Sequence, residues 1–182
     1  MKNFFSLALT IVIVSCTQSH ALTIDSLDVK PKSTLTSKQV FNGFGCKGEN
    51  ISPQIGWKDA PKDAKSFALT VYDPDAPTGS GWWHWLVVNI PTNYQELSTN
   101  FGAKDSFALK DGILQIKNDF GLYRFGGACP PQGDKPHKYI FTVHALKVDK
   151  LDLNESSSAA LAGYFINQNT IAKVSFNAFY SR

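Results

Sequence analysis

The chain has 182 residues, which is enough for one domain with its own hydrophobic core. Its formal net charge of +3 is a mild excess without a long basic run, and this argues against a nucleic-acid partner. Aromatic residues make up 13% of the chain while helix-period patterns are scarce, so strands are expected to dominate.

The first 21 residues have the organisation of a signal peptide. Lys2 gives a positive start, and the apolar run from Phe4 to Val14 is too short for a transmembrane helix. Ser19-His20-Ala21 predicts cleavage after Ala21, which leaves a mature chain of charge +2 because only Lys2 is lost from the total of +3. The alternative is a lipoprotein, since Ile13-Val14-Ser15-Cys16 resembles a lipobox. We expect a periplasmic or secreted protein with no transmembrane segment in the mature chain.

Residues 22–182 are expected to form one domain, a mostly antiparallel β sandwich. A helix is predicted over Ser156–Gln168, capped by Ser156–Ser158, with an apolar stripe of Leu161, Tyr164 and Phe165. Alternating or β-branched runs bounded by turn residues predict six strands: Leu22–Val29, Ser66–Tyr72, Trp83–Ile90, Ile113–Lys117, Lys138–Lys147 and Ala172–Tyr180.

Asp73-Pro74-Asp75-Ala76-Pro77 ends the second of these strands. The prolines hold φ and remove amide donors, so the segment must form a rigid turn. Asp73 and Asp75 could accept hydrogen bonds from a ligand. The alternative is that they bond to their own backbone, a common role of Asp in turns.

Trp82-Trp83-His84-Trp85 begins the next strand. Strict alternation predicts that His84 lies on one face and that Trp83 and Trp85 lie on the other. Because His84 is close to the strand end and the acidic turn, we expect it to contact a ligand, although a buried structural histidine is the alternative. Trp82 and its neighbours could form an apolar wall.

The loop Gly127–Gly133 contains Pro130 and Pro131 and no bulky side chain. Such a loop can bring backbone amides close to an anion, but it lacks the Lys and Ser/Thr of a nucleotide-binding loop. His137 and Tyr139 follow on one face of the next strand. Together these groups would suit a phosphate or a carboxylate, whereas a simple turn is the alternative. His144 should face the opposite side as a structural residue.

Cys46 and Cys129 are the only cysteines left after cleavage at Ala21. In an exported protein an isolated pair is expected to form a disulfide. Two buried free thiols are the alternative, and a metal site is disfavoured because the spacing does not match zinc ligands.

Nothing in these motifs requires catalysis. No serine lies in a nucleophile elbow, and paired cysteines would not act as nucleophiles. We therefore expect a non-enzymatic protein without a cofactor or metal; a hydrolase or lyase using Asp73 and His137 is the remaining catalytic alternative.

The two blocks, Asp73–Pro77 with His84 and Gly127–Gly133 with His137 and Tyr139, closely resemble the phosphatidylethanolamine-binding protein family, also called the Raf kinase inhibitor-like proteins. Further segments, Phe41–Pro53 and Asn118–Gly121, resemble the bacterial branch of that family. The resemblance covers essentially the whole mature chain.

This resemblance implies one large antiparallel sheet, a smaller sheet, few helices and a small anion pocket at one end. By motif position the pocket would be lined by Asp73, His84, His137 and Tyr139. The loop Gly127–Gly133, with Gly127, Pro130 and Pro131, would form one wall. Asp75 and Pro77 would shape the opposite wall, and Trp82 the edge. Trp83 stands where many eukaryotic members carry another histidine.

The sequence therefore predicts an exported binding protein for a small anion, such as a phosphate, a carboxylate or a phospholipid headgroup. The alternative is a protein-interaction role, as a protease inhibitor or a secreted modulator of a host pathway.

Overall fold

The computed structural model describes residues 21–182. The predicted signal peptide and lipobox, Ala21 apart, lie outside the described residues. Within 21–182, no helix is long and apolar enough to cross a membrane.

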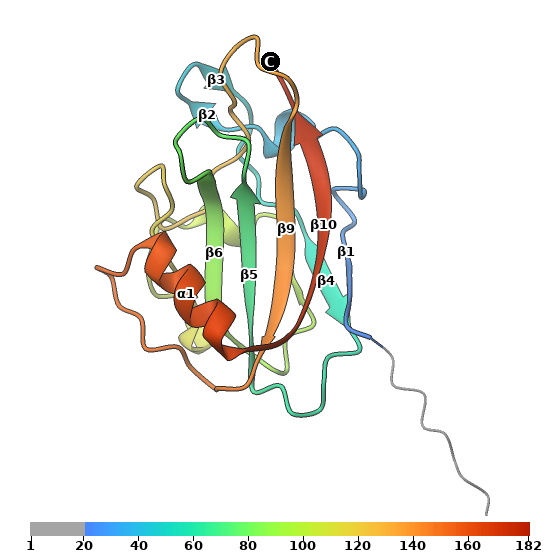
Figure 1. Cartoon of the computed structure of the whole chain (residues 1–182), viewed down its shortest axis with the longest axis vertical. Coiled ribbons are helices and arrows are strands. Elements are labelled where there is room, and N and C mark those ends of the chain that lie inside the picture. The colour runs from blue at the N-terminus through green and yellow to red at the C-terminus, as the bar shows by residue number, and fades with distance from the viewer. Residues whose placement is uncertain (1–20) are drawn as a thin grey trace, which may run out of the picture.

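One large antiparallel sheet dominates the fold (Figure 1). Its strand order is β10-β9-β5-β6-β8, and each neighbouring pair is antiparallel. The long strands match the predicted ones to within a few residues, because their β-branched and aromatic side chains suit a sheet buried on both faces. The bounds are β5 Ser66–Asp73, β6 Trp82–Pro91, β8 Leu114–Gln115, β9 His137–Leu146 and β10 Thr170–Tyr180.

A three-stranded sheet in the order β1-β4-β7 forms the second layer, and a separate two-stranded hairpin pairs β2 with β3. The predicted mostly β sandwich is therefore confirmed. These shorter strands are β1 Thr23–Asp25, β2 Asn42–Gly43, β3 Cys46–Lys47, β4 Ile55–Lys58 and β7 Glu96–Leu97. Single 3-10 turns cover Ser37–Gln39, Phe101–Ala103 and Lys110–Gly112.

The central strands β5, β6 and β9 of the large sheet are mostly buried on both faces, whereas the edge strand β10 is partly exposed. The first face of the large sheet packs against the small sheet, where Leu69 and Phe141 belong to the same buried cluster as Trp57 of β4. Its second face is covered by α1 (Ala159–Asn169), where Leu86 of β6 clusters with Ile166 (Figure 1). Each such fully buried side chain contributes about 1.5–3 kcal/mol through the hydrophobic effect. The central strands are therefore held between two hydrophobic cores.

The helix α1 was predicted correctly, but its buried face was not. Ser158 is the N-cap, and its Oγ accepts a hydrogen bond from the Leu161 amide at 3.1 Å. Leu161 and Tyr164 of the predicted stripe are 43% and 59% exposed. The buried residues are Ala159, Ala162, Gly163 and Ile166, and of the predicted stripe only Phe165 packs against the same core, where it is partly buried. Small residues are needed on this face because α1 lies close to the sheet. A Cβ on Gly163 would come within 3.3 Å of the Trp83 ring.

A β-bulge in β6 overturns the predicted alternation around His84. Val71 of β5 pairs with Trp85, but the next residue, Tyr72, pairs with Trp83, so β6 contains one extra residue. Trp85 consequently lies in the core between the sheets, whereas Trp83 packs toward α1. The two indoles lie on opposite faces, because a bulge reverses the side-chain alternation locally.

Candidate functional site

A pocket of about 360 Å³ lies at one end of the large sheet. Here β5 ends while β6 and β9 begin, and Figure 1 places the β2–β3 hairpin and the C-terminus at the same end. The residues that line it come from six separate segments: Phe44, Asp73, Ala76, Pro77, Thr78, Trp82, His84, Phe120, Cys129, Pro130, Pro131, His137, Tyr139 and Arg182.

A buried carboxylate and imidazole form the base of the pocket. Asp73 is the last residue of β5 and His137 the first of β9, so the neighbouring antiparallel strands bring them together. Oδ2 of Asp73 lies 2.8 Å from Nδ1 of His137, and both residues are 2% exposed. Oδ1 of Asp73 accepts a hydrogen bond from the Asp75 amide at 2.8 Å, which closes the predicted turn.

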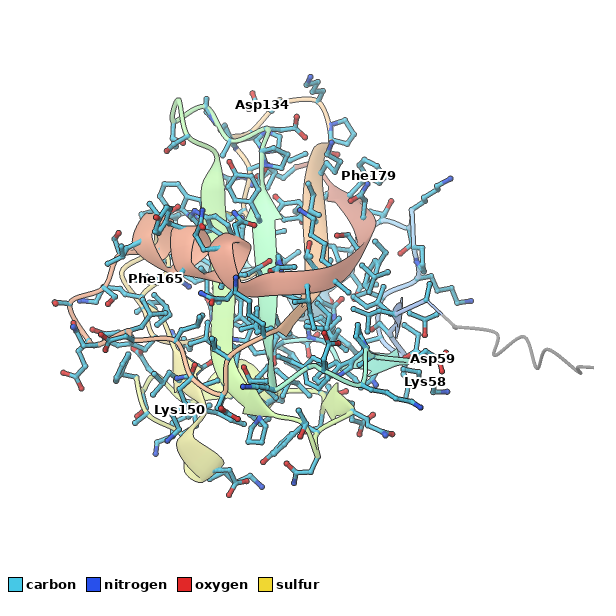
Figure 2. All side chains as sticks on the ribbon, turned by 60° about the horizontal axis from the view of Figure 1, so that its bottom comes forward. Lys58, Asp59, Asp134, Lys150, Phe165 and Phe179 are labelled. Carbon is cyan, nitrogen blue, oxygen red and sulfur yellow. A yellow bond between two sulfur atoms is a disulfide. The ribbon has the colours of Figure 1, made fainter. Side chains whose placement is uncertain are left out.

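A second carboxylate faces the same imidazole. Oδ2 of Asp134 lies 3.3 Å from Nε2 of His137, and this aspartate belongs to the loop before β9, at the end of the molecule opposite Lys150 (Figure 2). The His137 ring therefore lies between two carboxylates, of which Asp73 is buried and Asp134 is exposed.

His84 is held by a backbone carbonyl and not by a carboxylate. Its Nδ1 lies 2.8 Å from the carbonyl oxygen of Gly126, and since a carbonyl only accepts, Nδ1 must donate. Burial lowers the pKa of His84 to about 4, although its bond to Gly126 and the charge of Asp73 oppose the shift. At neutral pH the ring is uncharged and its Nε2 carries a lone pair.

Two buried donors of the pocket lining have no hydrogen-bond partner, the Tyr139 hydroxyl and Trp82 Nε1. Burial, and next the charge of Asp73, raise the pKa of Tyr139 far above its usual value, and the Cys129 amide opposes the rise only weakly. The hydroxyl therefore keeps its proton. A buried donor left unpaired costs about 1–3 kcal/mol, so both groups favour a ligand or water that can accept.

The loop Gly127–Gly133 forms one side of the pocket through Cys129, Pro130 and Pro131. Its first glycine is required by packing, because a Cβ on Gly127 would lie 2.4 Å from the Gln39 carbonyl oxygen. The predicted disulfide is present: Cys129 is bonded to Cys46 of β3. The loop is thus fastened covalently to the β2–β3 hairpin.

The structure brings most of the predicted site residues together. The pocket is lined by eight of them: Asp73, Pro77, Trp82, His84, Pro130, Pro131, His137 and Tyr139. Asp75 and Gly127 lie behind it. Oδ2 of Asp75 accepts from the Lys138 amide at 2.8 Å, and the Gly127 amide donates to Asn50. Both residues support the walls and do not line the pocket.

Sequence reasoning missed Phe44, Phe120 and Arg182. Arg182 Nε donates to the Pro130 carbonyl at 2.6 Å, which places a cationic group at the pocket. Phe44 and Phe120 carried a signal, because both lie in segments that resemble the family, and a bulky residue in Asn-Gly-Phe-Gly-Cys is also unusual for a turn. In residues 21–182 no group of three His, Cys, Asp or Glu side chains could hold a metal ion.

A two-layer β sandwich with a concave site at the end of its large sheet is the architecture of a binding protein. The family model described as phosphatidylethanolamine-binding protein matches residues 17–181, and the chain belongs to this family.

The relatives agree along almost the whole chain. UPF0098 protein YbcL of Escherichia coli is 48% identical over 180 residues, covering 99% of this chain and 98% of that protein. UPF0098 protein YbhB of the same organism is 46% identical over 156 residues, covering 86% and 98%. The crystal structure of E. coli YbcL superposes with a TM-score of 0.86 at 50% identity, covering 90% of this chain and 99% of that one.

Proposed function

We propose that this protein is an exported, non-enzymatic binding protein whose pocket holds a small ligand bearing a phosphate or carboxylate group. The observation that carries the proposal is the pair of unpartnered buried donors, the Tyr139 hydroxyl and Trp82 Nε1. Both require an acceptor, and oxygen atoms of an acidic group are strong acceptors.

Two further groups of the pocket, Arg182 and His84, restrict the kind of anion that would fit. The Arg182 guanidinium supplies a positive charge at the pocket, and His84 presents an acceptor nitrogen. A phosphate group that retains one hydroxyl satisfies both kinds of partner, because its P–OH donates to Nε2 of His84 while its other oxygens accept. A phosphomonoester monoanion is therefore a better match than a fully ionised anion.

The lining offers no activated nucleophile. Cys129 is bonded to Cys46, and the Thr78 hydroxyl already donates to the Gly81 carbonyl at 2.5 Å. The Asp73–His137 pair has the form of a base with its orienting carboxylate, but no hydroxyl or thiol stands beside it in the hydrogen-bond network. This favours binding over turnover.

A titration with inorganic phosphate, followed by amide NMR of the mature chain, tests the proposal. Saturable shifts should occur in the segments around residues 73, 84, 129 and 139. Tyr139→Phe should weaken binding about fivefold to tenfold, the effect of one lost hydrogen bond to a charged group. Tyr164→Phe, which alters an exposed tyrosine on α1, is the matched control and should change nothing. A folded sample without saturable shifts would exclude an anion site here.

Export is supported by the signal-like first 21 residues and by the Cys46–Cys129 disulfide, since such bonds persist in oxidising compartments. Fractionation of expressing cells should place the protein outside the cytoplasm. Mass spectrometry should find a mature chain that begins at Leu22; a lipid-modified chain beginning at Cys16 would support the lipoprotein alternative.

One distant structural neighbour is a carboxypeptidase Y inhibitor solved with its cognate proteinase, with a TM-score of 0.53 and 19% identity over 90% of this chain and 84% of that one. At that identity the likeness shows the fold alone. A protein-interaction role remains a prediction, which a pull-down with wild-type protein and an Asp73→Ala/His137→Ala variant would test. Capture of a partner that survives both substitutions would favour it over the pocket.

A further inference from the structure

The pocket has two chemically different parts. Four of its polar residues, Asp73, His84, His137 and Tyr139, are buried at 3% exposure or less, whereas Thr78 and Arg182 lie at its exposed edge. Phe44, Pro77 and Pro131 of the same lining are exposed and apolar. An acidic group bound to the buried donors would therefore leave its substituent against an apolar rim.

Phe44 is the most unusual residue of that rim. It is 69% exposed, and it occupies the turn between β2 and β3 with φ of +50°, followed by Gly45 at +81°. A turn with two positive φ angles strongly prefers Asn-Gly or Gly-Gly. A large apolar side chain is thus maintained where neither turn geometry nor burial favours it, which indicates a role for the ring itself.

The ring is held in a defined place. Its centroid lies 5.9 Å from that of Phe41 and 5.7 Å from that of Phe120. The rings of Phe120 and Trp82 in turn form a T-shaped pair with centroids 5.2 Å apart. The Cys46–Cys129 disulfide and the Arg182 contact with the Phe44 carbonyl fasten the hairpin to the loop around Pro130. An aromatic band therefore runs from the exposed rim to the unpartnered Trp82 Nε1.

We infer that the ligand of this pocket carries a planar aromatic ring next to its acidic group, and that the ring stacks on Phe44. The inference rests on the proposed anion-binding function and specifies its ligand class. A volume of about 360 Å³ is at the small end of ligand pockets, which accommodates one ring with its acidic group and is too small for a pair of acyl chains. Aromatic rings also prefer the faces and edges of other rings over flexible chains.

The test compares the dissociation constants of four probes by calorimetry: inorganic phosphate, methyl phosphate, butyl phosphate and phenyl phosphate. Phenyl phosphate should bind at least about fivefold more tightly than butyl phosphate, which has similar apolar area but no ring. Phosphocholine serves as a fifth probe, because an aromatic band can also attract a quaternary ammonium.

Phe44→Asn is the informative variant. Asparagine tolerates positive φ, so the hairpin should fold at least as well as in the wild type. The variant should lose the preference for phenyl phosphate and should still bind inorganic phosphate. Leu27→Asn, which removes another exposed apolar side chain outside the pocket, is the matched control and should keep the preference for phenyl phosphate over butyl phosphate.

The outcomes separate the two proposals. Binding of inorganic phosphate without any gain for phenyl phosphate would overturn the ring inference alone. A larger gain for butyl phosphate would point to an acyl chain, and a larger gain for phosphocholine to a cationic headgroup; either result overturns it. Failure of every probe, inorganic phosphate included, would overturn the anion-binding proposal and the ring inference together.

Discussion

Oδ2 of Asp134 lies 3.3 Å from Nε2 of His137, on the opposite side of the imidazole from Asp73. The Asp134 side chain is 41% exposed and comes from the loop that precedes β9, whereas the Asp73 side chain is buried. Asp134 thus places an exposed negative charge beside the imidazole that an anionic ligand would also approach. Substitution of Asp134 is therefore expected to change ligand affinity, whereas substitution of Asp73 is expected to change fold stability.

Asp134→Asn should strengthen phosphate binding about threefold to tenfold, because it removes a like charge from the site. Fold stability should change by less than about 1 kcal/mol, as is typical of exposed ion pairs. Calorimetric titration measures the affinity. Asp152→Asn makes the same change in net charge at another exposed site and should leave binding unaltered; equal gains in both variants would mean that only net charge matters.

Asp73→Asn should destabilise the fold by about 3 kcal/mol, because it leaves a buried imidazole without its carboxylate. The asparagine oxygen can still accept from the Asp75 amide, so the turn itself should persist. Urea unfolding measures the loss. Asp75→Asn, whose oxygen can still accept from the Lys138 amide, is the control and should lose much less. Similar losses in both variants would contradict a special role for the Asp73–His137 pair.

Phosphomonoester binding should weaken as pH rises. Because burial lowers the pKa of free His84 to about 4, its Nε2 is an acceptor at neutral pH, and the complex retains a proton between this nitrogen and the ligand. Above the second ionisation of the ligand, near pH 6, binding must take up that proton, so affinity should fall by up to about tenfold per pH unit.

Dissociation constants of methyl phosphate at pH 6, 7 and 8 measure this slope. Calorimetry in buffers of different ionisation enthalpy counts the proton directly. His84→Phe keeps a buried ring without the acceptor and should flatten the profile, while a flat profile in the wild type would contradict the assigned role of Nε2.

Removal of the disulfide should destabilise the protein. Cys46 and Cys129 are separated by 83 residues, and closure of a loop of this length is worth about 4.5 kcal/mol in the chain-entropy model. The Cys46→Ser/Cys129→Ser variant should show this loss in urea unfolding, and wild-type protein unfolded with a reducing agent should agree with it. A loss below about 1 kcal/mol would mean that the remaining contacts of the hairpin already restrain the two segments.

The long strands and several site residues could be predicted because their signals are local. Ser66–Tyr72 alternates and stops at the Asp-Pro turn, and His137 and Tyr139 share a face because they are two residues apart on an unbroken strand. The helix was recognisable from its serine cap. Its buried face was not, because the proximity of Trp83 to Gly163 decides which side of α1 packs closely, and that contact joins distant parts of the chain.

Local sequence patterns are sufficient to identify three chemical features at the strand ends: the Asp73–Pro77 turn, the Gly127–Gly133 loop and the cysteine pair. How these features face one another depends on the tertiary fold. The bulge opposite Val71 separates Trp83 from Trp85, which strict alternation had placed together. Phe44, Phe120 and Arg182 join the pocket from three segments that are far apart in the chain. The physical reason is that strand register and close packing depend on partners far away in sequence, whereas propensity and periodicity report only on neighbours.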